Sequence, residues 1–78
     1  MVHLIPLSHL QRGATARVAQ LVGGAEQVHR LEELGIRQGT QIEMVADGSP
    51  CIVKILGSKL CFRATQLLGV LVQPEDPH

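Results

Sequence analysis

This chain of 78 residues has almost no aromatic side chains: it holds a single Phe and no Trp or Tyr. The scarcity argues against two classes of binding protein, because single-stranded nucleic acids are stacked on aromatic platforms and proline-rich peptides are held in aromatic-lined grooves. The sequence also lacks a net charge, with seven basic and seven acidic side chains. Proteins that bind nucleic acid through its phosphates usually carry a positive charge. We therefore expect no nucleic acid among the partners.

Long apolar runs are absent as well. No segment is long enough to span a bilayer, and the N-terminus lacks the pattern of a secretory signal. We therefore expect no direct membrane insertion and a cytoplasmic location. Cys51 and Cys61 should be reduced thiols there, and their wide spacing is a poor fit to the close pairs of a zinc site.

The sequence also has no recognisable catalytic set. His9 and His29 are internal, but neither lies in a pattern with Asp or Glu that would suggest a base and its orienting partner. The glycines mark turns and do not have the spacing of a phosphate-binding loop. We therefore predict a protein that is not an enzyme.

The most informative feature that is present is a corner between a helix and a strand, encoded in residues 31–42. Gly35 suits the left-handed conformation that ends a helix, and Ile36 can then fold back onto Leu31. Gly39 permits a second turn, and Thr40 opens an alternating run. The pattern predicts a helix over about 25–34, followed by a tight corner and a strand.

Strand patterns recur through the rest of the chain. Alternation predicts strands over 14–22, 40–46, 51–56, 59–63 and 70–73, with short helical turns near 7–10 and 64–68. Short strands at this spacing are typical of small antiparallel barrels. We expect one mainly β domain over 1–73, a barrel of about five strands with one inserted α-helix, and a frayed polar tail over 74–78.

The strands over 51–56 and 59–63 should form a hairpin with Gly57 and Ser58 as its turn. In that register Ile55 pairs with Leu60. Alternation then places Cys51, Val53, Ile55, Leu60 and Phe62 on the inner face, and Ile52, Lys54, Leu56, Lys59, Cys61 and Arg63 on the outer face. The two cysteines point to opposite sides and should not bridge. The outer face presents basic and aliphatic residues together, as protein-contact surfaces do.

A metal site is a further candidate, on the exposed side of the predicted helix. Glu26, His29 and Glu33 lie three and four residues apart, so they can point to one side. Such a set could weakly hold a divalent cation, ferrous iron or zinc, with Cys61 as an added ligand. The alternative is an ordinary solvated helix face, and no cofactor is firmly predicted.

The order and spacing of these residues resemble the FeoA family and FeoA-like domains. The resemblance runs from about residue 4 to 72 and rests on Leu7-x-x-Leu10-x-x-Gly13, Val18, Arg30-Leu31-x-x-Leu34-Gly35-Ile36-x-x-Gly39-Thr40-x-Ile42, Pro50, Gly57, Leu60-Cys61-Phe62-Arg63 and Val70-Leu71-Val72. The chain departs from the family at Phe62, where members often have Leu. The resemblance implies an SH3-like β-barrel with an inserted helix. It also implies a small cytosolic accessory to FeoB, the membrane ferrous-iron transporter with a GTPase domain.

From this resemblance we expect an interaction module that binds the cytosolic part of a FeoB-type transporter and modulates iron uptake. The expected contact surface has two parts, a corner and an outer hairpin. The corner comprises Leu34, Gly35, Ile36, Arg37 and Gln38, and the hairpin contributes Lys54, Lys59 and Arg63. Weak homo-oligomerisation stays open. The alternative function is a small divalent-metal sensor or carrier that uses His29 with Glu26 or Glu33.

Overall fold

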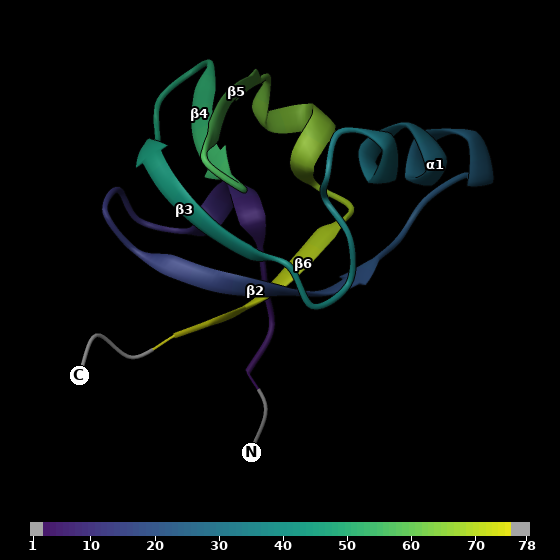
Figure 1. The fold of residues 1–78 in the computed structure, drawn as a ribbon, viewed down its shortest axis with the longest axis horizontal. Helices are drawn as coiled ribbons and strands as arrows, with labels where there is room; N and C mark the ends of the chain where they lie inside the picture. The colour runs from purple at the N-terminus through teal and green to yellow at the C-terminus, as the bar shows by residue number, and fades with distance from the viewer. Residues whose placement is uncertain (1–2, 76–78) are drawn as a thin grey trace.

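Six strands form one antiparallel sheet in the order β1-β6-β2-β3-β4-β5 within residues 3–75, which the computed structural model describes (Figure 1). The sheet curls around a core, and one α-helix stands at its side. The strands are β1 (Ile5–Pro6), β2 (Thr15–Leu21), β3 (Gln41–Ala46), β4 (Cys51–Ile55), β5 (Ser58–Phe62) and β6 (Val70–Pro74). The prediction of a mainly β barrel with one inserted helix is confirmed. The additional strand is β1, which has only two residues.

The core is almost entirely aliphatic, as the composition requires. Its members come from every strand except β1, from the helix and from the short turns. They are Leu7, Leu10, Ala16, Val18, Leu31, Ile36, Ile42, Met44, Cys51, Val53, Ile55, Phe62, Leu67, Val70 and Val72. No polar or charged residue in the described part of the chain is buried, so hydrophobic burial is the main stabilising term.

Two β-bulges interrupt the ladders. The pairing of β2 with β6 shifts between Val18 and Gln20, and the pairing of β3 with β4 shifts between Met44 and Ala46. A bulge bends its strand and increases the local twist, which helps a sheet of this size to curl. The first bulge falls beside Gln20, the polar residue that interrupts the apolar alternation in the sequence.

The β4–β5 hairpin turns one residue earlier than the sequence suggests. Leu56 and Gly57 form the turn with φ of 52° and 84°, so Ile55 pairs with Ser58 and Val53 with Leu60. The predicted turn at Gly57 and Ser58 is therefore wrong. Two successive positive φ values are typical of the tight turn whose twist matches that of antiparallel strands. Each residue of β4 meets a partner two residues earlier than predicted, and because side chains alternate with period two, the predicted inner and outer faces are retained.

The helix α1 (Ala25–Glu33) begins after Gly24 and ends as the sequence predicts. Gly35 adopts a φ of 100°. The N–H of Ile36 donates to the carbonyl of Leu31 and the N–H of Gly35 to that of Glu32, both at 3.0 Å. This pair of hydrogen bonds defines the Schellman motif, which satisfies carbonyls at a helix end.

The last two residues of the loop after α1, Gly39 and Thr40, are hydrogen-bonded to β2. The N–H of Gly39 donates to the carbonyl of Val18 at 2.7 Å, and the N–H of Val18 donates to the carbonyl of Thr40 at 2.9 Å. These bonds extend the β2–β3 ladder to the residues just before β3 begins. The corner between helix and sheet is therefore fixed in space.

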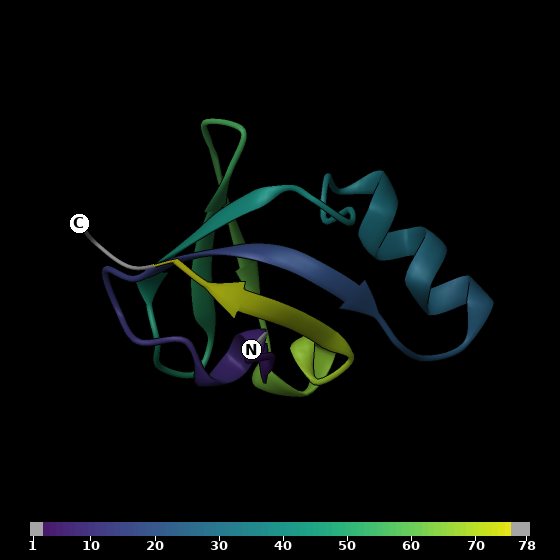
Figure 2. The ribbon, with the colours of Figure 1, turned by 90° about the horizontal axis from the view of Figure 1, so that it is seen from below.

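Two 3₁₀ turns, η1 (Leu7–His9) and η2 (Ala64–Leu67), contact each other. Figure 2 shows β2 and β6 running side by side.

The first two residues of the tail that was expected to fray are ordered against β2. Pro74 belongs to β6, and the N–H of Glu75 donates to the carbonyl of Thr15 at 2.9 Å. Residues 76–78 lie outside the described range. No helix within the described residues is long and apolar enough to cross a membrane.

Candidate functional site

The corner contains one buried residue, Ile36, and three exposed ones, Leu34, Arg37 and Gln38. Ile36 is fully buried in the core, whereas Leu34 is 45% exposed. Arg37 and Gln38 are exposed beside it. The Nε of Arg37 donates to the carbonyl of Glu32 at 3.0 Å, so this side chain is tied to the end of α1. A partner could touch Leu34, Arg37 and Gln38, while Ile36 acts by holding them in place.

The three hairpin cations are all exposed. Lys54 lies directly opposite Lys59 in the β4–β5 ladder, and no ion pair within the described residues involves Lys54, Lys59 or Arg63. The whole segment from residue 48 to residue 74 contains these three cations and no acidic residue. The neutral overall charge therefore conceals a basic face on the hairpin.

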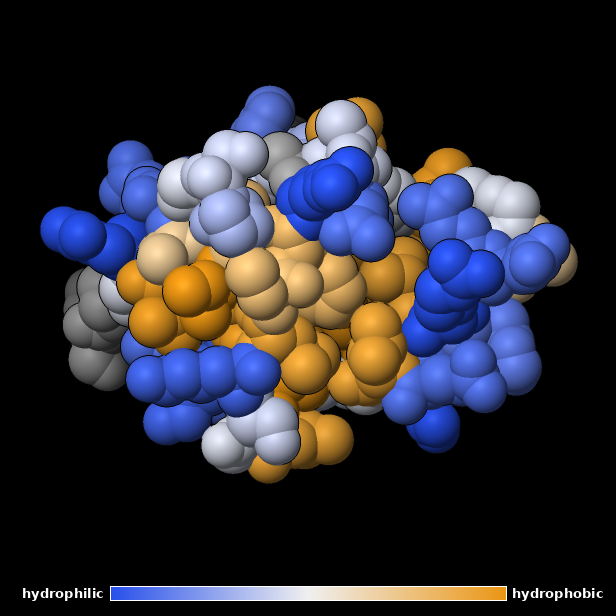
Figure 3. Space-filling model, turned by 90° about the horizontal axis from the view of Figure 1, so that it is seen from above, coloured by the Kyte–Doolittle hydropathy of each residue, from blue (hydrophilic) through white to orange (hydrophobic). Residues whose placement is uncertain are grey.

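The fold brings the corner and the hairpin tip together. A Cβ placed on Gly35 would lie 3.5 Å from Cγ2 of Ile55 and 3.7 Å from Cδ1 of Leu56. Leu56 is 83% exposed. The space-filling view from above shows an apolar area with hydrophilic side chains on both sides of it (Figure 3). The corner and the hairpin tip therefore adjoin, whereas Arg63 follows the other end of β5.

The predicted metal ligands do not gather in the same way. His29 Nδ1 lies 3.8 Å from an Oε of Glu33, but the nearest charged group to Glu26 is Arg30, at 3.9 Å. Within residues 3–75, no three His, Cys, Asp or Glu side chains lie close enough to hold a metal ion together. Cys61 is exposed on β5, on another element. The metal set stays a prediction.

The structure adds a groove that the sequence did not indicate. It has a volume of about 450 Å³ and lies between α1 and the end of the barrel. Its helix wall consists of Gly24, Gln27, Leu31 and Leu34, its barrel wall of Phe62 and Gln66, and Glu26 and Arg30 complete the lining. The walls come from segments about thirty residues apart in the sequence, so no local pattern could have revealed them.

Comparison with known proteins gives a consistent result. The family model of the FeoA domain matches residues 5–74, and no match was found among curated proteins. An iron uptake regulatory protein (FeoA) has a solved structure with a TM-score of 0.88 at 22% identity, covering 94% of this chain and 99% of that chain.

Two further solved structures show the range of similar proteins. FeoA of Stenotrophomonas maltophilia, complexed with zinc, has a TM-score of 0.76 at 26% identity, covering 95% of this chain and 99% of its own. IdeR of T. acidophilum has a TM-score of 0.86 at 17% identity, and the match covers 96% of this chain but only 36% of IdeR. The S. maltophilia protein is described as an SH3 domain protein.

Proposed function

This chain belongs to the FeoA domain family, and from that membership we propose that it is a non-enzymatic accessory of ferrous iron transport, acting in the cytoplasm. Its partner is the cytosolic part of a FeoB-type transporter, and binding modulates iron uptake. The S. maltophilia relative is described as a candidate activating factor for ferrous iron transport, which supports the same role for this chain.

The observation that carries the proposal is the surface formed where the corner adjoins the hairpin tip. This surface combines exposed apolar residues, Leu34 and Leu56, with the exposed cations Lys54 and Lys59, and Arg63 follows at the other end of β5. An apolar centre with a charged rim is the usual anatomy of a protein interface. The hydrogen bonds that tie the corner to the end of α1, and those from Gly39 and Thr40 to β2, reduce the conformational entropy lost on binding. The face is therefore suited to contact a protein.

A titration tests the proposal. Isotope-labelled protein is mixed with the soluble GTPase domain of the transporter from the same organism, and backbone amide shifts are followed. We expect shifts at residues 34–38 and along β4 and β5. The variant Lys54→Glu with Lys59→Glu should fold and bind more weakly, and Arg12→Glu, in the loop before β2, should bind as the wild type does. The absence of any shift in an excess of the domain would contradict the proposal.

A divalent-metal sensor or carrier is the second candidate. It is favoured by the 3.8 Å separation of His29 and Glu33 and by the zinc complex of the S. maltophilia relative. Titration with zinc or ferrous ion, followed at the ring of His29, separates the two functions. No shift at stoichiometric metal would reject this second candidate.

A further inference from the structure

The strand β5 is an edge of the sheet and has a neighbour on one side only. It stands last in the strand order, and within the described residues it pairs with β4 alone. The opposite edge, β1, has only two residues, and one of them is a proline without an N–H. The open side of β5 is therefore the longer of the two edges. An edge of this kind is a template for one further strand.

The register shows which backbone groups of β5 are unpaired. Ser58 follows a two-residue turn and exchanges both backbone hydrogen bonds with its partner in β4. Bonded and non-bonded pairs alternate along an antiparallel ladder. Leu60 and Phe62 are thus bonded to β4, whereas the N–H and C=O of Lys59 and Cys61 point to the open side.

The hydrogen bonds of β3 agree with this alternation. Both backbone groups of Met44 bond to the segment that leads into β2, at 3.0 and 2.7 Å. Glu43, one residue earlier, therefore faces β4, where it lies opposite Lys54. Lys54 directs its N–H and C=O toward β3, so Lys59, which lies opposite Lys54 in the next ladder, directs its own away from β4.

Arg63 ends the open stretch. Its N–H donates to Oε1 of Gln66 at 2.8 Å, and its C=O accepts from the N–H of Gln66 at 2.9 Å. Both backbone groups of Arg63 are therefore used at the start of η2. The edge that remains open runs from Lys59 to Cys61, a length of about 10 Å, and both of these residues are exposed. It has room for a short extended segment held by the two N–H and two C=O groups.

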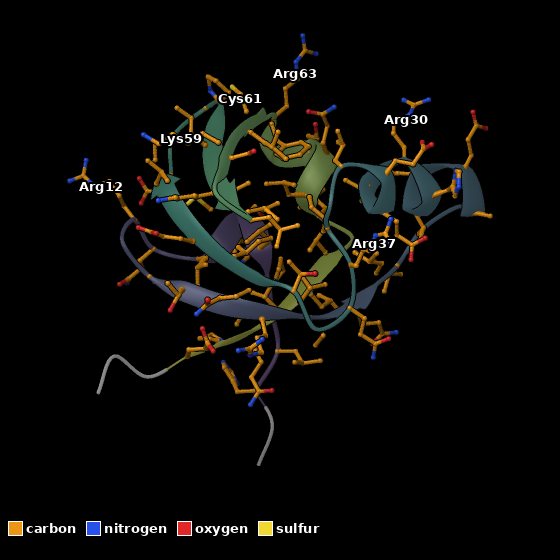
Figure 4. All side chains as sticks on the ribbon, in the orientation of Figure 1. Arg12, Arg30, Arg37, Lys59, Cys61 and Arg63 are labelled. Atoms are coloured by element: carbon orange, nitrogen blue, oxygen red, sulfur yellow. The ribbon has the colours of Figure 1, made fainter. Side chains whose placement is uncertain are left out.

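The charged side chains along this edge are all basic. Lys59 and Arg63 are exposed, and Figure 4 shows both of them, with Cys61, pointing away from the barrel. No ion pair within the described residues involves either cation. Pairing with the β5 of a second copy would place the cations of both chains on one face, and like charges on neighbouring strands repel. A segment that carries carboxylates is attracted instead, so the charge selects the occupant.

The inner face of the edge sets the requirement at the alternate positions. Phe62 is buried in the core, and Leu60 is half-buried and packs against it. A strand laid beside β5 places every second side chain next to these two residues. Apolar side chains at those positions cover the surface of Leu60 that the free protein leaves in water.

We propose that the open edge of β5 binds an extended acidic segment of the transporter's cytosolic part by strand addition. Backbone hydrogen bonds to Lys59 and Cys61 hold the segment. Asp or Glu lies across from Lys59 and Arg63, and apolar residues lie across from Leu60 and Phe62. The recognised pattern is therefore acidic, apolar, any, apolar, acidic, in either strand direction. The inference rests on the proposed function, and it names the kind of segment that is recognised. In strand addition the main chain supplies affinity and alternate side chains supply specificity.

Amide hydrogen exchange of this protein tests the edge without any substitution. In the free protein the amides of Lys59 and Cys61 should exchange fast, and those of Leu60 and Phe62, which are bonded to β4, should exchange slowly. Saturation with the transporter's cytosolic domain should slow exchange at Lys59 and Cys61 by about tenfold or more. Leu60 and Phe62 are the internal controls. Unchanged exchange at Lys59 and Cys61 in a complex that has formed would overturn the inference.

A proline at Cys61 removes one N–H from the open edge and no bond to β4. Proline is tolerated in an edge strand where the N–H faces outward, and the melting temperature of the variant checks that it folds. The Kd of Cys61→Pro for the cytosolic domain should rise about tenfold, as for the loss of one backbone hydrogen bond. Cys61→Val keeps the N–H and should bind within about threefold of wild type. Equal binding by these two variants would contradict strand addition.

Two further measurements identify the occupant. Lys59→Glu should weaken binding, while Arg12→Glu, in the loop before β2, should not. Hydrogen exchange of the partner should show protection of one short segment with the acidic and apolar alternation, and protection confined to a helix would overturn the inference. So would protection of Lys59 and Cys61 that grows with the concentration of this protein alone, because a second copy would then occupy the edge.

The outcomes separate the two proposals. If the wild-type protein does not bind the cytosolic domain, the proposed function itself fails and this inference fails with it. If the wild type binds while the amides of Lys59 and Cys61 stay unprotected, only the inference is overturned.

Discussion

The backbone N–H of Ile36 donates to the carbonyl oxygen of Leu31 at 3.0 Å, across the end of α1. Both side chains are buried in the core, so the bond joins the last turn of the helix to the start of the corner. Arg37 adds a side-chain bond to the neighbouring carbonyl of Glu32. The position of the candidate surface therefore depends on a few backbone bonds around Gly35.

Replacing Gly35 should destabilise the protein. Its φ of 100° lies in a region that β-branched residues resist strongly. A Cβ would make only ordinary contacts with Ile55 and Leu56, so the cost comes from the backbone. We expect Gly35→Val to lower the free energy of unfolding by about 2 kcal/mol, measured by urea unfolding. Gly48→Ala, at a site with open space and an ordinary φ, is the matched control, and equal stability of the two variants would refute this account of the corner.

Gly69 should be intolerant of substitution for a different reason. A Cβ built there would overlap the backbone carbonyl of Val22, and the N–H of Val22 donates to the carbonyl of Gly69 at 2.7 Å. Backbone cannot move aside as a flexible side chain can. We expect Gly69→Ala to cost about 2 kcal/mol or more of stability, seen as a lower melting temperature. An unchanged melting temperature would contradict this prediction, because it would mean that the backbone at Val22 can move away from residue 69 at little cost.

The facing lysines of the hairpin predict a gain of stability on charge reversal. Lys54 and Lys59 lie directly opposite each other, and like charges in this position repel. Lys59→Glu should therefore raise the free energy of unfolding by about 0.5 kcal/mol at low salt. The double variant Lys54→Glu with Lys59→Glu restores the repulsion and places a carboxylate opposite Glu43. It should be less stable than the single variant, and the difference should fade at high salt.

The two thiols should differ sharply in reactivity. Cys51 is 1% exposed and Cys61 is exposed on the outer face of β5. A thiol reagent added to the folded protein should modify Cys61 at once and Cys51 only as the protein unfolds. Cys61→Ser then leaves no rapidly reacting thiol. Rapid modification of both thiols in the native protein would contradict the predicted division between inner and outer faces.

Much of this fold follows from local patterns. The helix, its end at Gly35 and the inner and outer faces of the hairpin are each encoded within a few neighbouring residues. The hairpin register is harder to predict, because Gly57-Ser58 has the better turn composition whereas the chain places Leu56 in the left-handed region. The strand β1 is invisible to such patterns because two residues carry no alternation, and its pairing with β6 is set by the distant segment that it meets.

The candidate surface is predictable only in part. The exposure of Lys54, Lys59 and Arg63 follows from strand alternation, and that of Leu34 from its place at the helix end. The burial of Ile36 follows from the capping motif, which makes this residue a support and not a contact. The groove depends on how α1 and Phe62 lie across space, and only tertiary packing determines that arrangement.

The strand order has a consequence for how the chain folds. The strand β6 follows every other strand in the sequence, yet it lies between β1 and β2. Neither of these early strands can complete its hydrogen bonds on that side until β6 arrives, and closing so long a loop costs entropy before any contact compensates it. Folding should therefore be slow for a protein of this size and should follow synthesis of β6. A nascent chain that lacks β6 would expose two unpaired strand edges to whatever protein it meets first.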